Sequence, residues 1–293
     1  MDPWHDIELA IREAEGAPFS IESRSAAGGG CINECHIVRG QGRGYFVKTN
    51  APDRAGMFAA EAAGLDEIGR TRAIRVPRTV CHGACPAASW IALELLELQS
   101  PDDRGLRALG RNLARLHRVT AGRYGWQRDN TIGSTPQINT PSEDWIAFWR
   151  EQRLGLQLDL AAATGQGGRL IESGRRLMEK LPALFTGYLP APSLLHGDLW
   201  SGNAGMTASG EPVIYDPAVY YGDREADLAM TELFGGFPQS FYASYRAEYP
   251  LDAGYATRKH LYNLYHVLNH LNLFGGGYGA QAERMIGLLL AAA

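Results

Sequence analysis

The amino-acid sequence predicts an α+β protein with two lobes. Short strand-like runs between glycine-rich turns fill most of the first hundred residues, and long helical patterns fill the remainder. Ser100-Pro101-Asp102-Asp103 separates the two regions, as a run of turn-forming residues does. Strands and helices that are segregated along the chain are typical of the α+β class. We therefore expect an N-terminal lobe of residues 1–98 and a C-terminal lobe of residues 99–293.

The small first lobe is expected to hold one antiparallel sheet with one main helix. Residues 4–15 place apolar side chains at helical spacing, which predicts a short amphipathic helix before the sheet. Residues 55–68 are rich in Ala, Glu and Leu and predict the main helix. Alternating or continuous apolar runs predict strands at residues 19–25, 32–38, 45–49, 76–80 and 90–96.

The larger second lobe is expected to be mostly helical. Its apolar residues recur at helical spacing, and the Gly-rich GGGYG after the last pattern is a typical helix stop. The predicted helices cover residues 106–118, 145–163, 170–185 and 257–274.

Composition excludes some partners. The 293 residues include 28 Lys plus Arg against 32 Asp plus Glu, so a net charge of −4 gives no general attraction to nucleic acid or an anionic membrane. The N-terminus lacks the long apolar core of a secretory signal. The C-terminal run IGLLLAAA is too short to span a bilayer. We expect a cytoplasmic protein that binds neither nucleic acid nor membrane.

Four cysteines lie at Cys31, Cys35, Cys81 and Cys85, each pair four residues apart. His36 and His82 are adjacent to them, so the pattern admits a zinc site. Ordinary reduced thiols near strand ends are the favoured interpretation for a cytoplasmic chain.

The stretch LLHGDLWSGN places an acid and an amide on one short loop. Asp198 and Asn203 follow an apolar run, and Asp216 ends another in VIYD. Phosphoryl transfer needs an oriented hydroxyl and cations that neutralise the phosphate oxygens. One carboxylate beside the hydroxyl, with a second carboxylate and an amide oxygen on Mg²⁺, would supply this. The spacing therefore indicates phosphoryl-transfer chemistry.

The first lobe carries a complementary series. Gly28-Gly29-Gly30 lies between two predicted strands, where backbone amides could approach phosphates. Lys48 lies on the next strand, and Glu61 on the following helix could hold it. A Gly loop, a strand Lys and a helix Glu, followed by the acids and amide of the second lobe, form a kinase-type arrangement.

With these residues in place, the sequence shows a family resemblance. HGDLWSGN resembles the H-G-D-x-x-x-x-N loop of the small-molecule branch of the protein-kinase-like superfamily, which includes aminoglycoside and choline kinases. The fuller LLHGDLWSGN is similar to the fructosamine kinase (ketosamine 3-kinase) family. GGGCINE, YFVKTN, MFAAEAAGL, DPAVYYGDREADLAMTELFGGF and LYNLYHVLNHLNLFGGGY agree with it, so the likeness runs nearly end to end.

The resemblance implies a bilobal protein-kinase-like fold and a reaction. ATP and Mg²⁺ would be the cofactors, and the γ-phosphate would pass to the O3 hydroxyl of a ketosamine. Such adducts form when an aldose glycates an amine, so the substrate would be a small ketosamine or a glycated lysine on a protein. The 3-phosphate favours elimination, which implies deglycation repair. A monomer or weak homodimer is expected.

The resemblance also implies residue roles. Asp198 would be the catalytic base, Asn203 and Asp216 the metal ligands, and Lys48 with Glu61 the phosphate-positioning pair. His196 would brace the catalytic loop, and Asp227 would anchor it from a helix. The remaining ATP contacts would come from backbone groups of the glycine loop and the interlobe segment: Gly28, Gly29, Gly30, Cys31, Glu94, Leu95 and Leu96.

Some residues leave alternatives open. Trp200 is a candidate platform for a sugar or a core residue. His266 and His270, four residues apart on one predicted helix, could ligate a metal, but packing and hydrogen bonding are favoured; the helix could also border the substrate cleft, which makes His270 a candidate substrate residue. Asn130, Gln137 and Asn139 either bind sugar hydroxyls or satisfy buried backbone. Cys31 in the glycine loop is either a redox brake on ATP binding or simply a small buried side chain. Asp223 stands where some family members have histidine, which bears on substrate detail.

Two other functions fit parts of the pattern. One is a kinase for another small hydroxyl substrate, such as an aminoglycoside or an amino alcohol like choline. The other is a non-catalytic nucleotide-binding pseudokinase. The presence of Lys48, Asp198, Asn203 and Asp216 together favours a catalyst.

Overall fold

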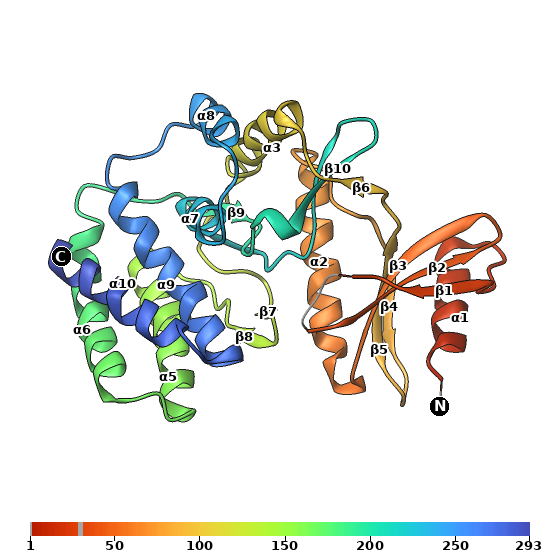
Figure 1. Cartoon of the computed structure of the whole chain (residues 1–293), viewed down its shortest axis with the longest axis horizontal. Helices are drawn as coiled ribbons and strands as arrows, with labels where there is room; N and C mark the ends of the chain where they lie inside the picture. The colour runs from red at the N-terminus through yellow and green to blue at the C-terminus, as the bar shows by residue number, and fades with distance from the viewer. Residues whose placement is uncertain (1, 29–31) are drawn as a thin grey trace. The chain divides into compact units, whose positions relative to one another are not determined.

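A computed structural model describes residues 2–28 and 32–293, and the chain divides into two compact units (Figure 1). The first unit comprises Met1–Gly105 and Ala204–Pro217, and the second comprises Leu106–Asn203 and Ala218–Ala293. The first contains the main sheet and the second most of the helices, which confirms the α+β prediction. The division at residues 98 and 99 stays a prediction about functional lobes.

The main sheet of the first unit has five antiparallel strands in the order β1-β2-β3-β5-β4. The strands predicted at residues 32–38 and 45–49 are present as β2 and β3, but β1 begins four residues later than expected. The strands are β1 (Ser23–Ala26), β2 (Glu34–Gly40), β3 (Arg43–Asn50), β4 (Thr79–Ala84) and β5 (Ser89–Glu94).

Two helices lie on opposite faces of this sheet, α1 (Trp4–Glu15) and α2 (Ala55–Thr71) (Figure 1). Successive side chains of a strand point to opposite faces. Val47 of β3 therefore joins Ile7 and Ile11 of α1 in one buried cluster, while the adjacent Lys48 reaches Glu61 of α2.

A second sheet explains why residues 204–217 belong to the first unit. β10 (Ala204–Thr207) pairs antiparallel with β11 (Pro212–Ile214) on one side and β6 (Leu98–Gln99) on the other. Val213 also forms a parallel bridge with Arg75. These pairings fix the backbone just before Asp216. The short helix η1 (Pro52–Arg54) precedes α2.

The second unit is built from helices with two short strand pairs. α9 packs against α5, α7 and α10, and α6 packs against α10. The helices are α3 (Asp103–Leu116, whose first residues belong to the first unit), α4 (Trp145–Trp149), α5 (Leu156–Ala163), α6 (Gly168–Leu184), α7 (Glu225–Leu233), α8 (Gln239–Glu248), α9 (Tyr255–Phe274) and α10 (Tyr278–Ala292).

One of the two short strand pairs of this unit leads directly into the candidate catalytic loop. β9 (Ser193–Leu195) pairs antiparallel with β12 (Tyr220–Gly222), and β7 (Asn130–Ile132) pairs with β8 (Thr135–Gln137). The short helix η3 (Ser201–Asn203) closes the loop that follows β9.

One predicted helix contains an irregularity. Residues 145–163 are helical throughout, but Arg150–Gly155 form a π-helical segment, labelled η2, between α4 and α5. The buried Arg153 lies in it and donates to the Ile138 carbonyl (2.6 Å) and to Asn139 Oδ1 (2.7 Å). π-Helical segments often occur near functional sites.

The helix predicted over residues 257–274 ends as expected. Gly275 follows α9 with a φ of 67°, a conformation that glycine adopts readily. α7, α8 and α10 were not predicted as helices from their residue patterns. None of the helices in the described part of the chain is both long and apolar enough to cross a bilayer.

Packing of α1 on the sheet can be tested by Ile11→Ala. Ile11 is fully buried, so its loss should lower the unfolding free energy by about 2–5 kcal/mol. Leu9→Ala on the same helix is the control, because Leu9 is 41% exposed, and it should cost under about 1 kcal/mol. Urea unfolding followed by circular dichroism measures both, and equal losses would contradict the packing described.

Candidate active site

Lys48 is the central residue of the polar site in the first unit. Its Nζ donates to Glu61 Oε1 at 2.6 Å and to Asp216 Oδ1 at 2.5 Å. Only 5% of the lysine side chain is exposed. The sequence-predicted pair is thus a triad, since Asp216 also bonds the lysine.

The charges of this triad support one another. Burial disfavours the Lys48 ammonium, but Glu61 and Asp216 outweigh it and raise the pKa of Lys48 above its ordinary value. Burial raises the pKa of the Glu61 carboxyl, and the field of Lys48 opposes that rise. Lys48 therefore stays protonated at neutral pH and is a fixed positive charge.

Asp216 holds an uncommon backbone conformation. Its φ is +58°, in the left-handed region that few residues other than glycine adopt. Its side chain is 42% exposed, and only Oδ1 makes a hydrogen bond among the residues described. The second carboxylate oxygen can therefore accept another ligand. A residue held in a rare conformation is often functional.

Of the other predicted nucleotide contacts, those within the described residues lie at strand ends of the same sheet or directly after them. Gly28 follows β1, while Gly29, Gly30 and Cys31 lie outside the described residues. Glu94 ends β5; its N–H donates to the Arg78 carbonyl at 2.9 Å, and its carboxylate pairs with Arg75. Leu95 and Leu96 follow directly, and their backbone groups make no hydrogen bond within the described chain.

In the second unit, Asp227 holds the loop that contains Asp198. Its carboxylate accepts the N–H of His196 at 2.7 Å and of Gly197 at 2.8 Å. Gly197 has a φ of 84°, and a Cβ there would lie 2.0 Å from the Ala218 carbonyl oxygen. Only glycine fits at this position of the loop.

Two residues that sequence reasoning missed lie behind Asp227. His117, which directly follows α3, places Nε2 at 3.1 Å from Asp227 Oδ2 and Nδ1 at 2.7 Å from the Tyr245 hydroxyl of α8. Burial alone would raise the pKa of Asp227, but its bond to His117 leads the interactions that lower it below the usual value. Asp227 is therefore an anion buried among donors.

Asn203 and Asp198 are joined within the loop. Asn203 donates from Nδ2 to the Asp198 carbonyl at 2.8 Å, and the Asp198 N–H donates to His196 Nδ1 at 3.2 Å. Because the Asn203 nitrogen is committed to the loop, its Oδ1 is the atom left for a ligand. An amide oxygen here and the carboxylate oxygen of Asp216 are donors of the type that Mg²⁺ prefers.

A row of aromatic rings begins at Trp200, which is partly exposed. Its ring centroid lies 6.3 Å from that of Phe234, which lies 4.8 Å from the ring of His270. His270 also contacts Phe274 and Tyr278 at 5.6 and 5.2 Å. The structure therefore brings the two predicted substrate residues into one cluster.

Histidines 266 and 270 are joined through the helix backbone. His270 Nδ1 donates to the His266 carbonyl at 2.8 Å. Burial, with a contribution from His270, lowers the pKa of His266 to about 3, so that ring is neutral at ordinary pH.

The amides at Asn130, Gln137 and Asn139 are buried and bond mainly to the protein. Gln137 and Asn139 both donate to Asn130 Oδ1, at 2.8 and 2.9 Å, and Asn130 donates to the Val219 carbonyl at 2.8 Å. This geometry favours backbone support over sugar binding.

Asp223 is also part of the interior. It accepts the hydroxyls of Tyr188 at 2.9 Å and Tyr262 at 2.5 Å, and burial raises its pKa. Its contacts bind α9 to the segment before α7.

Cys35, Cys81 and Cys85 are unpaired thiols. Burial raises the pKa of Cys35, and it raises that of Cys81 to about 11. Within residues 2–28 and 32–293, no three or more His, Cys, Asp or Glu side chains are grouped to hold a metal ion.

These elements define a phosphotransferase of the protein-kinase-like fold. An aminoglycoside phosphotransferase shares the fold at a TM-score of 0.63 and 14% identity, with 99% of each chain covered. The fructosamine kinase model matches residues 3–292, so this chain belongs to the fructosamine kinase family.

Individual relatives support this family assignment. A candidate ketoamine kinase of Synechocystis is 47% identical over 97% of this chain and 96% of the relative. The chloroplastic protein-ribulosamine 3-kinase of Arabidopsis thaliana is 45% identical over 95% and 87%. The crystal structure of a candidate fructosamine-3-kinase from Haemophilus somnus has a TM-score of 0.90 at 29% identity, covering 99% and 100%.

Asp227→Asn should destabilise the second unit. The amide cannot accept all the donors that face the carboxylate, and an unsatisfied buried group costs about 1–3 kcal/mol. Because the folded pKa of Asp227 is depressed, its contribution is complete above the unfolded value near 3.8 and is lost as the pH falls through the folded value.

The measurement is urea unfolding of wild type and variant between pH 8 and pH 3.5. The difference in unfolding free energy between wild type and Asp227→Asn should be constant down to about pH 5 and should become smaller below about pH 4. Asp159→Asn, an exposed carboxylate on α5, serves as the control and should change stability little. A difference that widens toward acid would show that Asp227 is not a depressed, stabilising anion.

Proposed function

We propose that this protein is an ATP-dependent kinase that transfers the γ-phosphate to the O3 hydroxyl of ketosamines, both small ketosamines and glycated lysines. Family membership along nearly the whole chain carries this proposal. Relatives named as ketoamine and ribulosamine kinases support this substrate class over an aminoglycoside, because the aminoglycoside phosphotransferases share only the fold.

In the first unit, Lys48 would bind the ATP phosphates, and Glu61 would keep its ammonium in place. Their 2.6 Å contact and deep burial support this role. The backbone at Gly28, Gly29, Gly30 and Cys31 would contact the phosphates, as the family resemblance implies. Glu94, Leu95 and Leu96 would meet adenine; since the Glu94 N–H is already bonded to Arg78, Leu95 and Leu96 would provide the backbone contacts.

In the second unit, Asp198 would orient the substrate hydroxyl and accept its proton. The backbone bonds from His196 and Gly197 to Asp227 would hold the loop so that Asp198 does not need to reorganise. Asn203 and Asp216 would each contribute an oxygen to Mg²⁺, and both have such an oxygen to offer. The bound ion would neutralise charge on the phosphate oxygens.

Trp200 and His270 would bind the ketosamine. The partly exposed indole directly follows the catalytic loop's Asp198-Leu199, and the ring of Phe234 links it to His270. Aromatic faces pack well against the C–H face of a sugar, and a histidine nitrogen can bond a hydroxyl.

The function is tested by incubating the protein with ATP, Mg²⁺ and a panel of acceptors. We expect phosphorylation of fructosyl- or ribulosyl-lysine at O3, identified by ³¹P–¹H NMR, and little transfer to kanamycin or choline. Preferential transfer to kanamycin or choline would replace the proposed substrate class. ATP binding without transfer to any acceptor would support a pseudokinase.

Asp198→Asn should lower kcat by about 10²–10⁴-fold while nucleotide affinity changes little, because the amide cannot accept the hydroxyl proton. Steady-state kinetics with the preferred ketosamine and calorimetry with AMP-PNP measure the two effects. Asp66→Asn on α2 removes an exposed carboxylate and should leave both unchanged. Preserved turnover with lost nucleotide affinity would contradict the role of Asp198.

A further inference from the structure

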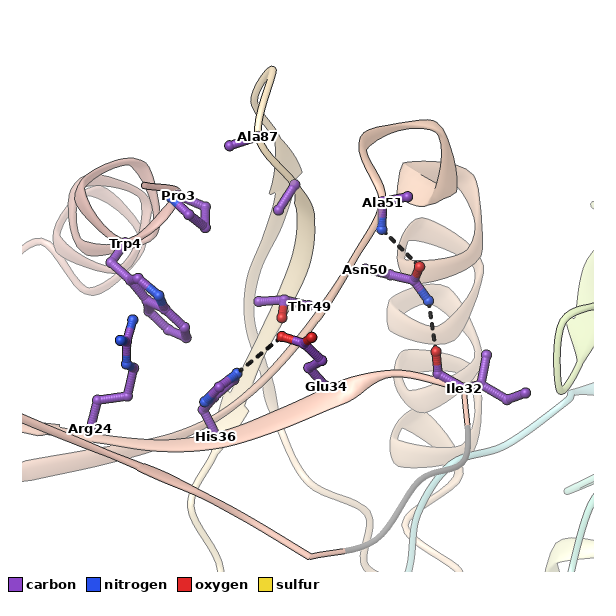
Figure 2. Close-up of a pocket in the computed structure, with 11 residues that line it drawn as sticks. Pro3, Trp4, Arg24, Ile32, Glu34, His36, Thr49, Asn50, Ala51 and Ala87 are labelled. Carbon is purple, nitrogen blue, oxygen red and sulfur yellow. Dashed lines mark hydrogen bonds and ion pairs between the residues drawn. The ribbon is translucent and has the colours of Figure 1, made fainter. Parts of the chain in front are cut away.

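A cavity of about 540 Å³ lies in the first unit, and neither Lys48 nor its partners Glu61 and Asp216 line it. Figure 2 shows the residues that do. Its walls come from the start of α1, from β1, β2 and β3, and from the turn between β4 and β5. Its lining includes Trp4, Arg24, Ile32, Glu34, His36 and Thr49. The volume is in the range of small-molecule sites.

The cavity results from the length of α1. This helix covers the sheet face that carries Val38 and Val47, and it begins only at Trp4. Glu34 and Thr49 are paired residues farther along the same face, beyond the first turn of the helix. This end of the sheet face is therefore left open beside the indole of Trp4.

Arg24 supplies the cation of the cavity. Its guanidinium lies 4.4 Å from the centroid of the Trp4 ring, so the stack fixes its plane. No Asp or Glu in the described chain lies within ion-pair distance of it. An arginine held by an aromatic face with its donors unpaired is suited to a carboxylate or phosphate.

His36 adds a second nitrogen. Its ring contacts that of Trp4 edge to face at 4.9 Å, and its Nε2 makes no hydrogen bond to any described residue. Glu34 Oε2 lies 3.9 Å from this atom, too far for a hydrogen bond. The Glu34 side chain is 85% exposed and can turn away into solvent.

His36, Arg24 and Glu34 together determine the charge of the cavity. Burial, then the neighbouring Arg24, lowers the pKa of His36, so at neutral pH the ring is an uncharged hydrogen-bonding group. Arg24 is then the cation that lines the cavity, and Glu34 is its exposed anion. An incoming anion would displace Glu34 and take both nitrogens.

The remaining walls suit a compact organic body. Pro3, Ile32 and Ala87 are apolar, and Thr49 of β3 offers a hydroxyl. A bare inorganic anion would leave most of the volume unused. The arrangement therefore calls for one anionic group on a body of about the size of a sugar.

We propose that this cavity is a second binding site, for a small organic phosphate, in which Arg24 and His36 hold the phosphate and Trp4 packs against the rest of the molecule. The site is separate from the proposed nucleotide site. Thr49 faces the cavity, and the preceding Lys48 points to the opposite face of the same strand.

The test is calorimetric titration of the whole protein with glucose 6-phosphate, gluconate and glucose, with and without saturating Mg²⁺–AMP-PNP. We expect glucose 6-phosphate to bind in both conditions, gluconate more weakly and glucose not measurably. Arg24→Gln should weaken binding about tenfold or more, as loss of a charged hydrogen bond does. Arg70→Gln, an exposed arginine on α2, should bind like wild type.

Two further measurements locate the ligand. Thr49→Val keeps the shape of the cavity and should weaken binding by a smaller factor than Arg24→Gln. The Trp4 indole N–H signal, assigned with Trp4→Phe, should shift during an NMR titration with glucose 6-phosphate.

Several results would overturn the proposal. These are absence of binding to wild type, unchanged affinity in Arg24→Gln, tighter binding of gluconate than of glucose 6-phosphate, or displacement by AMP-PNP. Failure of AMP-PNP to bind would count against the proposed kinase function alone, because the Arg24 comparison does not depend on it.

Discussion

The buried ammonium of Lys48 is the constraint on which the first unit depends. An unpaired charge in a protein interior is too costly to keep, so Glu61 and Asp216 must both approach it. Glu61 comes from the helix that covers the sheet, and Asp216 comes from a segment 168 residues farther along the chain. The small sheet of β6, β10 and β11 carries that segment to the lysine, which explains why residues 204–217 belong to this unit.

The second unit is also organised around a buried charge, but here the charge is negative. Asp227 is a buried carboxylate, and its partners are the backbone N–H groups of His196 and Gly197 and the ring of His117. A buried anion with directed donors stays ionised and defines one loop conformation. In both units a buried charge fixes the geometry, and the residue proposed to meet substrate or metal is more exposed than the charge that holds it.

The sequence predicts the elements that their own residues determine. It does not predict features that depend on contacts with residues far away in the chain. β3, α2 and the end of α9 at Gly275 follow from alternation, helix formers and a glycine stop. α7 lacks a polar face, since Glu225 to Thr231 are all buried, so periodicity does not reveal it. HGDLWSGN marks the loop, but His117 lies 110 residues from Asp227 and directly follows an ordinary leucine-rich helix. The π-helical segment at Arg153 is likewise not predicted from its own residues, because Arg153 forms its hydrogen bonds with Ile138 and Asn139, outside the helix.

The alternation of β3 also explains how one small unit can carry two chemically different surfaces. Val47 and Thr49 face α1 and the cavity, whereas Lys48 between them faces α2 and Asp216. A one-residue slip of this strand would exchange the faces, so the buried salt bridges on one side and the apolar cluster on the other select the same register. The pairing of β3 with both β2 and β5 leaves no edge along which it could slide. The placement of Lys48 beside Glu61 and Asp216 and the formation of the Trp4 cavity are therefore two consequences of one strand register.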